Sequence, residues 1–246
     1  MKSLRWIVPF LCLSAFVGLG LLSSCSISTL GGGRSTYGDR PGPVGFRTVI
    51  IDAGHGGKDS GARARGLTEK TLTLDLAERL RKELDRDFRV VMLRKSDSFV
   101  DLDDRVRRAN GYGGAILVSL HFNYGSRYLA GPETYYWRSD SYSLGKRIQA
   151  ALEKASPYER GNRGLVRRRL RLTRNPLIPC VLVEGGYLTN SYDAGRIATS
   201  TYRQQLAKAI AGAIRDQRAF GDRGMGTLPK PIYAPLSKST DARDSW

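Results

Sequence analysis

The hydrophobic positions of this chain form short apolar runs that alternate with segments of helical periodicity. The four clearest runs are Thr48–Ile51, Arg89–Leu93, Ala115–Leu120 and Cys180–Val183. They are rich in aliphatic and β-branched residues, and they lack the polar–apolar alternation of a strand with one solvated face. We therefore expect them to be buried strands of a largely parallel sheet.

Amphipathic segments separate these runs. In the first of them Leu72, Leu76, Leu80 and Leu84 recur every four residues, which is typical of a helix with one apolar face. Three further helices are expected at Asp101–Asn110, Tyr142–Ala155 and Tyr202–Arg215. Buried strands separated by helices predict an α/β fold, with helices on both faces of the sheet.

The two ends of the chain lack this periodicity. Residues 26–46 are rich in Gly, Ser and Pro and read as a flexible tether, so that segment 25–46 links an anchor to the domain. Residues 221–246 have a similar composition and are expected to be a disordered tail. No repeat or second domain is visible, so we place one folded domain at residues 47–220.

The N-terminus has the pattern of an export signal. A basic start is followed by an apolar stretch over residues 6–22 and then by small residues. Pro9 and two glycines argue against a stable membrane-spanning helix, although an uncleaved anchor is the alternative. Leu22-Ser23-Ser24-Cys25 resembles a bacterial lipobox. We therefore expect a signal peptide at residues 1–24 and a lipid on Cys25, which would anchor the exported protein to a membrane facing the cell wall (the outer membrane, in the periplasm, if the cell has two).

The chain carries a large positive charge. Its 40 Lys and Arg residues outnumber 23 Asp and Glu residues, giving a formal net charge of +17. Such an excess attracts nucleic acids, anionic membranes and acidic cell-wall polymers. Export argues against nucleic acid, and the basic run at 165–174 lacks the interleaved aromatic residues that stack on bases. The simplest interpretation of this run is a solvated strand face; contact with carboxylates, anionic lipid or polymer is the alternative.

The cysteines leave no internal disulfide. Cys12 would leave with the signal peptide and Cys25 would carry lipid, so that only Cys180 remains. Cys180 begins an apolar run, where a thiol acts as a small buried hydrophobic group rather than as a nucleophile.

Polar residues follow the predicted strands. Asp52 and His55 come after the first, Arg94 after the second, His121 after the third and Glu184 after the fourth. In open α/β sheets, sites lie at the carboxyl ends of the strands. We therefore expect the two histidines of the chain and Glu184 to meet at one edge of the sheet.

Two imidazoles and one carboxylate, with an open fourth position, form a catalytic zinc site. Glu69 is the best third ligand because it begins the leucine-striped helix, near the His55 loop, where a carboxylate suits the positive helix end. Asp52 and Asp59 are the alternatives. Glu184 precedes two glycines and is the candidate general base for an activated water.

Several motifs together point to a family. They are IIDAGHGGKDSGA (50–62), Glu69 at the helix start, RKSD (94–97), DRVRRAN (104–110), SLHFN (119–123), GPETYYW (131–137) and VLVEGGYLTN (181–190). In this order they resemble the zinc-dependent N-acetylmuramoyl-L-alanine amidases of type 3, and the resemblance covers residues 48–217.

The resemblance implies a twisted, mixed sheet flanked by helices. It also implies one Zn²⁺ per chain on His55, Glu69 and His121, with Glu184 as catalytic acid and base. The substrate would be peptidoglycan, cut at the amide between the lactyl group of muramic acid and L-alanine. Within the same motifs, the candidates for supporting the ligands or contacting substrate are Arg105, Asn110, Asn123 and Glu133.

Two departures from the family bear on the site. Phe122 stands where a small residue is usual, which would narrow the pocket. The segment from Tyr135 to Asn162 has room for one ordinary helix and none for the plug that some division amidases carry, so we expect a monomer that needs no activator. A zinc peptidase or carboxypeptidase acting on the stem peptide, and a non-catalytic wall-binding lipoprotein, remain the alternative functions.

Overall fold

The computed structural model describes residues 35–156 and 163–238. The predicted signal peptide, Cys25 and the first part of the tether lie outside these residues, as do residues 239–246. Among the described residues, no helix is both long and apolar enough to cross a bilayer.

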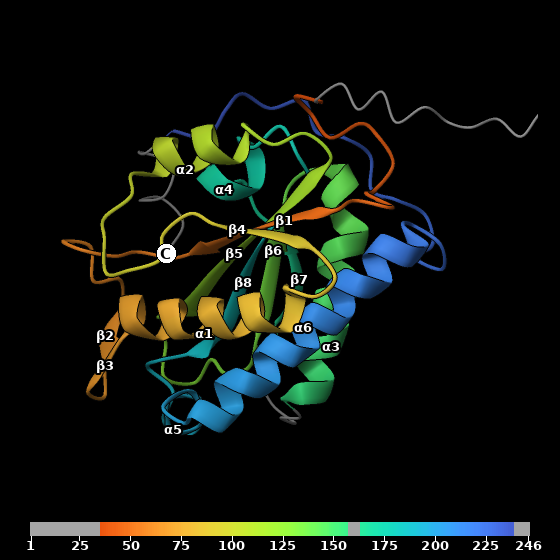
Figure 1. Ribbon diagram of the computed structural model, residues 1–246. Coiled ribbons are helices and arrows are strands. Elements are labelled where there is room, and N and C mark those ends of the chain that lie inside the picture. Colours follow the sequence, from red (N-terminus) through yellow and green to blue (C-terminus); the bar gives the residue numbers. More distant parts are fainter. Residues whose placement is uncertain (1–34, 157–162, 239–246) are drawn as a thin grey trace, which may run out of the picture. The chain divides into compact units, whose positions relative to one another are not determined.

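A six-stranded mixed sheet forms the centre of the domain (Figure 1). Its strands, in spatial order, are β4 (Arg89–Met92), β1 (Thr48–Ala53), β5 (Ala115–Asn123), β8 (Cys180–Tyr187), β6 (Glu133–Tyr136) and β7 (Gly164–Arg167). The first four are parallel, whereas β6 runs antiparallel to β8 and pairs with β7 in parallel. The predicted α/β fold with a mostly parallel, mixed sheet is confirmed.

The helices cover the two faces of this sheet unequally. Three long helices pack on one face: α1 (Glu69–Leu84), α3 (Tyr142–Ala155) and α6 (Ser200–Phe220). Two short ones, α2 (Leu102–Ala109) and α4 (Arg171–Arg174), pack on the other. The remaining elements are the hairpin β2 (Arg63–Ala64) and β3 (Leu67–Thr68), the 3₁₀ turn η1 (Ser139–Ser141) and helix α5 (Ser191–Ile197).

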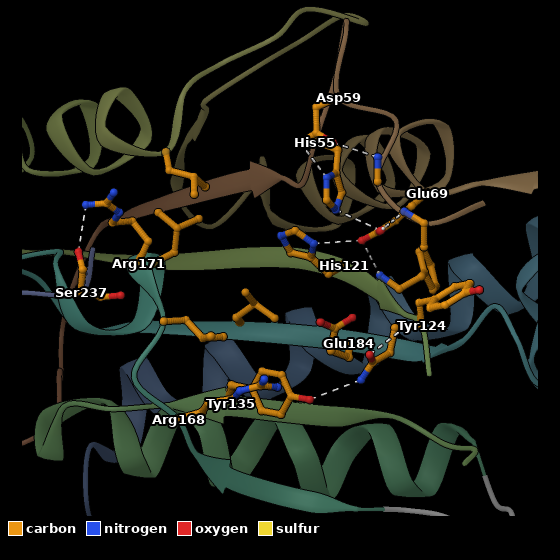
Figure 2. Close-up of a pocket in the computed structure, with 18 of the residues that line it drawn as sticks. His55, Asp59, Glu69, His121, Tyr124, Tyr135, Arg168, Arg171, Glu184 and Ser237 are labelled. Carbon is orange, nitrogen blue, oxygen red and sulfur yellow. Dashed lines mark hydrogen bonds and ion pairs between the residues drawn. The ribbon is translucent and has the colours of Figure 1, made fainter. Parts of the chain in front are cut away.

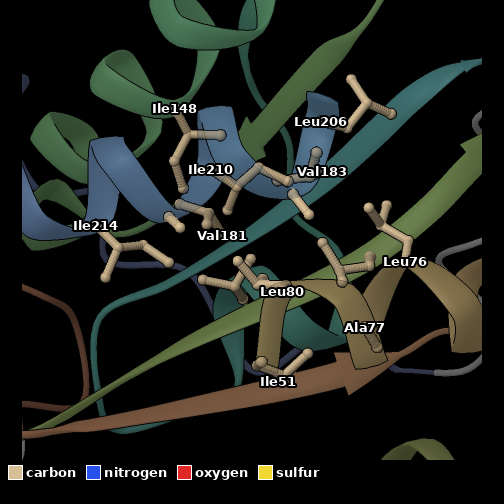
Figure 3. Packing of buried hydrophobic residues seen from close by; sticks show 14 of the residues in the cluster. Ile51, Leu76, Ala77, Leu80, Ile148, Val181, Val183, Leu206, Ile210 and Ile214 are labelled. Atoms are coloured by element: carbon tan, nitrogen blue, oxygen red, sulfur yellow. The ribbon is translucent and has the colours of Figure 1, made fainter. Parts of the chain in front are cut away.

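The pleat of the strands assigns alternate residues to the two faces. In β5, Val118 and Leu120 join the large core cluster beneath the long helices, together with Leu76 and Leu80 of α1. Figure 3 shows this packing around α1 and α6. Ser119 and His121 therefore point to the opposite face, where α2 and α4 leave part of the sheet uncovered. The leucines of α1 pack on one face of the strands and form the core there. The polar side chains of the same strands therefore lie on the other face, where they are accessible.

The central strands run further than the apolar runs indicated. β5 continues to Asn123 and β8 to Tyr187, so that His121 and Glu184 lie within strands and pair with each other in register. Glu184 also pairs with Glu133 of β6. The polar side chains therefore gather on one face of the sheet near its carboxyl end, rather than beyond the ends of the strands, because backbone pairing does not stop where hydrophobicity stops.

The flanking segments differ from the flexible ends that the composition predicted. In residues 35–46, the Gly42 N–H donates to the Asp222 carboxylate at 2.7 Å, and Phe46 stacks on Phe88 at 5.7 Å between ring centroids. Residues 221–238 form no helix or strand, yet backbone carbonyls between Lys230 and Ser237 accept hydrogen bonds from arginines of the basic run. Tertiary hydrogen bonds order segments whose local sequence favours flexibility.

Candidate active site

A pocket of about 680 Å³ occupies the uncovered part of the sheet (Figure 2). Its floor contains His121 of β5 and Glu184 of β8, and one wall is the loop that carries His55. The basic segment 168–171 and residues 237–238 form the opposite wall. The pocket thus joins segments from the beginning, middle and end of the domain.

Three predicted ligand residues meet in this pocket. His55 Nε2 lies 3.0 Å from Glu69 Oε2, and His121 Nδ1 lies 2.9 Å from Glu69 Oε1. One potential ligand atom from each residue can be chosen so that all three lie within 4.8 Å of one another. Among the described residues this is the group of His, Cys, Asp and Glu side chains that could hold a metal ion.

Glu69 is fixed from several sides. It is the first residue of α1, and its Oε2 accepts a hydrogen bond from the Ala62 N–H at 2.8 Å, while Oε1 accepts one from the Phe122 N–H at 3.2 Å. Burial alone would raise the pKa of the Glu69 carboxyl, but the hydrogen bonds and charges of His121 and His55 outweigh burial and lower the pKa. Glu69 is therefore an anionic anchor between the two imidazoles.

The loop before Glu69 adopts a backbone that few residues allow. His55 has φ of 61°, in the left-handed region that non-glycine residues rarely occupy. Gly61 has the same φ, and a Cβ there would lie 2.5 Å from both Glu69 Oε2 and His55 Cδ2. Gly54 lacks room for a Cβ because the His121 ring packs against it. The glycines of the opening motif thus allow the chain to pass directly beside the metal-ligand candidates.

Two buried arginines hold this loop from below. Arg94 donates to the carbonyl oxygens of Ala53 at 2.9 Å and Gly54 at 2.8 Å. Arg105, one of the predicted supporting residues, donates to the carbonyl oxygens of Ala53 at 2.8 Å and His55 at 2.6 Å. The sequence placed Arg94 after a strand but gave no sign that its guanidinium would bind the backbone of the histidine loop.

The two alternative ligands have other partners. Asp52 is fully buried, forms an ion pair with Arg105 and accepts a hydrogen bond from Ser119 Oγ at 2.7 Å. Asp59 Oδ2 lies 2.8 Å from His55 Nδ1, the ring nitrogen that faces away from Glu69. A carboxylate at this position orients a metal-binding imidazole and fixes its tautomer.

Glu184 lies on the floor beside the triad, and its side chain faces the pocket (Figure 2). Its Oε2 is buried and has no hydrogen-bond partner among the described residues. Burial raises the pKa of the Glu184 carboxyl well above its usual range; the negative charges of Glu69 and Glu133 raise it further, and the charge of Arg168 opposes the rise. A carboxyl with a raised pKa, in a pocket beside candidate metal ligands, is a candidate general acid and base.

Glu133 is buried next to Glu184 in the sheet, but it does not line the pocket. The Tyr187 hydroxyl donates to its Oε1 at 2.5 Å, the Tyr135 hydroxyl donates to its Oε2, and Arg163 Nε lies 3.1 Å from Oε1. Its position is therefore that of a buried negative charge behind Glu184.

The other candidate residues divide between the site and the scaffold. Asn123 lines the pocket and donates from Nδ2 to the Tyr135 hydroxyl at 3.3 Å. Asn110 lies outside the pocket: it caps α2, and its Oδ1 accepts a hydrogen bond from the Leu177 N–H at 2.8 Å. Phe122 is among the residues that line the pocket, while its side chain packs in the core cluster on the far face of the sheet, because neighbouring strand residues point to opposite faces.

Several residues that line the pocket were not named as candidates from the sequence, among them Tyr135 of β6, Arg168 and Ser237. Tyr135 lies within the motif GPETYYW and Arg168 within the basic run, so both had a sequence signal, whereas Ser237 had none. Cys180 is fully buried, and burial raises the pKa of its thiol to about 12, in agreement with a structural rather than nucleophilic role.

Comparison with known proteins identifies the family. Residues 49–216 match the model of the Amidase_3 family, described as N-acetylmuramoyl-L-alanine amidase. The sporulation-specific N-acetylmuramoyl-L-alanine amidase of Bacillus subtilis is 34% identical over 178 residues, which are 70% of this chain and 68% of that protein.

Solved structures agree. N-acetylmuramoyl-L-alanine amidase AmiC2 of Nostoc punctiforme is 35% identical with a TM-score of 0.66, and the match covers 70% of this chain and 97% of that one. The catalytic domain of CwlV from Bacillus (Paenibacillus) polymyxa var. colistinus is 34% identical with a TM-score of 0.65, over 69% of this chain and 97% of that one. The chain therefore belongs to the N-acetylmuramoyl-L-alanine amidase family, as the fold, the triad and the order of its motifs together require.

Proposed function

We propose that this enzyme cleaves the amide between N-acetylmuramic acid and L-alanine of peptidoglycan with one zinc ion held by His55, Glu69 and His121. The observation that carries the proposal is the buried, unpaired Oε2 of Glu184 beside that triad. A carboxylate without a partner costs free energy when buried, and an acid–base role in the reaction accounts for its retention.

The residues present fit zinc. Two imidazoles and one carboxylate are the donor set of catalytic zinc sites that leave a fourth position for water or substrate. Asp59 accepts from the outer nitrogen of His55, which supports binding through Nε2. Backbone N–H groups of Ala62 and Phe122 orient the carboxylate of Glu69.

When bound, zinc supplies a Lewis acid that polarises the scissile carbonyl and lowers the pKa of a water molecule. Glu184 would accept the proton of that water at Oε2 as the water oxygen attacks the lactyl carbonyl carbon. The same carboxyl would then donate the proton to the amide nitrogen as the carbon–nitrogen bond breaks. The products are a muramic acid carboxylate and a stem peptide with a free L-alanine amino group.

The decisive test compares the wild-type full chain with E184Q and H55A on purified peptidoglycan. We expect E184Q to keep its zinc and to lose about 10²–10⁴-fold in rate, because general acid–base catalysis contributes that much. H55A should lose zinc as well as activity. The measurements are zinc content and the appearance of free L-alanine amino termini, with and without a chelator.

The exposed Glu153 on α3 provides the matched control, since E153Q makes the same chemical change outside the pocket. Wild-type rates in E184Q, or activity that survives complete metal removal, would contradict the mechanism. Release of fragments cut within the stem peptide would instead favour the zinc peptidase alternative.

We further propose that the enzyme acts as a monomer without an activator. Helix α3, the one helix in the described part of segment 135–162, packs against α6 on the face of the sheet opposite the pocket. It therefore leaves the triad uncovered. The purified chain should be active alone; activity that appears only after a cell extract is added would overturn this proposal.

On the basis of the N-terminal sequence, we propose that the enzyme is exported and attached to a membrane through a lipid on Cys25. The net charge of +17 supports attraction to an anionic wall.

A further inference from the structure

The segment Lys230–Lys238, which we call the strap, accepts hydrogen bonds from arginines of the basic run 165–174. Arg167 donates to the Lys230 carbonyl oxygen at 2.9 Å, and Arg171 donates to the Ser237 carbonyl oxygen at 2.9 Å. Arg174, only 2% exposed, donates from Nε to the Ala234 carbonyl oxygen at 3.0 Å. The basic run is therefore not a solvated strand face, because its guanidinium groups serve as donors to one extended segment.

Asn175 fixes the far end of the strap. Its Nδ2 donates to the Ser237 carbonyl oxygen at 3.0 Å, and its Oδ1 accepts from the Ser237 N–H at 2.8 Å. Ser237 is consequently buried, and Ser237 and Lys238 line the pocket that contains Glu184. The strap thus forms part of the wall of the catalytic pocket.

The charges of this pocket are separated in space. Two carboxyls, Glu69 and Glu184, lie at the floor, whereas the lining opposite the His55 loop is basic. On that side the pocket is lined by Arg168, Arg169, Arg171 and Lys238, whereas Arg63 lies in β2, next to Ala62, whose N–H donates to Glu69. Arg171 also forms an ion pair with Asp103 at 2.9 Å.

Arg168 lies beside an aromatic residue of the pocket. Its guanidinium lies over the ring of Tyr135, 5.4 Å from the centroid, and both residues line the pocket. Figure 2 shows the two residues next to each other. A second hollow, of about 670 Å³, is lined by the same Arg168 and Tyr135. Arg168 therefore stands where a ligand that extends beyond the catalytic centre would pass.

The strap lies outside the residues that match the family model. That match covers residues 49–216. The basic wall of the pocket therefore combines residues of the matched family domain with a segment that lies beyond the match.

We propose that Arg168, joined by Lys238 of the strap, binds a carboxylate of the peptide that follows the scissile amide. This inference rests on the proposed function, because it takes its ligand from the product side of that bond. A planar guanidinium recognises carboxylates through paired, charge-assisted hydrogen bonds, and its effect is larger in a partly enclosed pocket than in open solvent. The preferred substrate is then a muramoyl peptide whose second residue carries a free carboxylate rather than a carboxamide.

The test measures binding separately from catalysis, in full-length E184Q loaded with zinc. The probes are N-acetylmuramoyl-L-alanyl-D-glutamate with its γ-carboxyl blocked as an amide, and the same compound with its α-carboxylate also converted to an amide; calorimetry gives Kd for each. We expect the free acid to bind about 10–100-fold more tightly, the range of a hydrogen bond to a charged group. R168Q in this background should abolish the preference, and K238Q should reduce it.

R86Q is the matched control, because Arg86 is exposed in the turn after α1 and far in sequence from the pocket wall. A variant that ends at Thr227 removes the strap, and it should also lose the preference while circular dichroism shows an intact fold. If this variant does not fold, the comparison of R168Q with R86Q decides alone.

Equal affinity for the two peptides, no measurable binding of either, or an unchanged preference in R168Q overturns the inference. Failure of the proposed function has a different signature. In that case the wild-type chain would leave peptidoglycan uncut, whatever the Kd values of the two probes in E184Q.

Discussion

At the scale of single residues, the site depends on glycines that lack a Cβ as well as on the side chains that form it. Gly61 and Gly66 both have positive φ, 61° and 76°, and both precede α1. Around Gly66 no atom lies within 4 Å of the place where a Cβ would be, whereas at Gly61 that place is 2.5 Å from Glu69 Oε2. Both glycines thus adopt a backbone that favours glycine, but only at Gly61 would an added Cβ also collide with Glu69.

This pair gives a sharp prediction. G61A and G66A should each lose about 1–2 kcal/mol of stability, the cost of left-handed backbone in a residue with a Cβ. Only G61A should displace Glu69 from the two histidines, and we expect its zinc affinity to fall by on the order of 10–100-fold. Competition with a chromogenic chelator measures the affinity, and thermal unfolding measures the stability. Equal zinc affinity in the two variants would show that Gly61 is not needed for the triad.

At the scale of elements, α1 links stability to the site. Its first residue is Glu69, and its apolar stripe, Leu72 to Leu84, is buried against the strands that carry the other site residues. Arg203 of α6 donates to Asp75 of α1 at 2.5 Å, and this partly buried contact links the two helices. The helix is positioned by its core contacts, and the position of its first carboxylate follows.

The core contacts of α1 can be tested at Leu80, which has no exposed surface. L80A removes buried methyl groups and leaves a cavity, so we expect a loss of about 2–5 kcal/mol in the free energy of unfolding. T71A, at an exposed position of the same helix, should change it by about 0.5 kcal/mol or less. Urea denaturation followed by circular dichroism gives both values; a small effect of L80A would mean that the helix is held mainly by other contacts.

At the scale of the whole molecule, the net charge and the proposed lipid attachment would both keep the enzyme near the cell wall. An excess of basic residues attracts a protein to an acidic polymer over long range, but this attraction is screened by salt. A lipid on Cys25 would keep the enzyme near the wall independently of salt. The length of the tether, rather than diffusion, would then set the distance over which the enzyme can reach its substrate.

Anchoring predicts a difference between two cysteines of the N-terminal segment. C25S should move the protein from the membrane fraction to the soluble fraction, because it removes the site of lipid attachment. C12S should leave the protein in the membrane fraction, since Cys12 lies in the apolar stretch that the signal peptidase would remove. Fractionation at high salt followed by immunoblotting measures the distribution, and identical behaviour of the two variants would refute lipidation at Cys25.

Much of the architecture can be predicted from local sequence patterns. Helix α3 has the predicted bounds, Tyr142–Ala155, and the strands β1, β4, β5 and β8 begin where the four apolar runs begin. These features depend on periodicity and on burial of continuous apolar segments, which are properties of neighbouring residues. The short strands β6 and β7 were not predicted, because their register comes from pairing with β8 and with each other.

The sequence by itself determined the fold class, the family and the set of chemically capable residues, because motifs and periodicity are local. Tertiary structure alone decided their distances and partners: Glu69 between the imidazoles, Asp59 behind His55, and Asp52 paired with Arg105. It also turned a segment expected to be disordered into a pocket wall, since the donors that hold Ser237 come from residues more than sixty positions away. Long-range hydrogen bonds of this kind leave no trace in the local sequence.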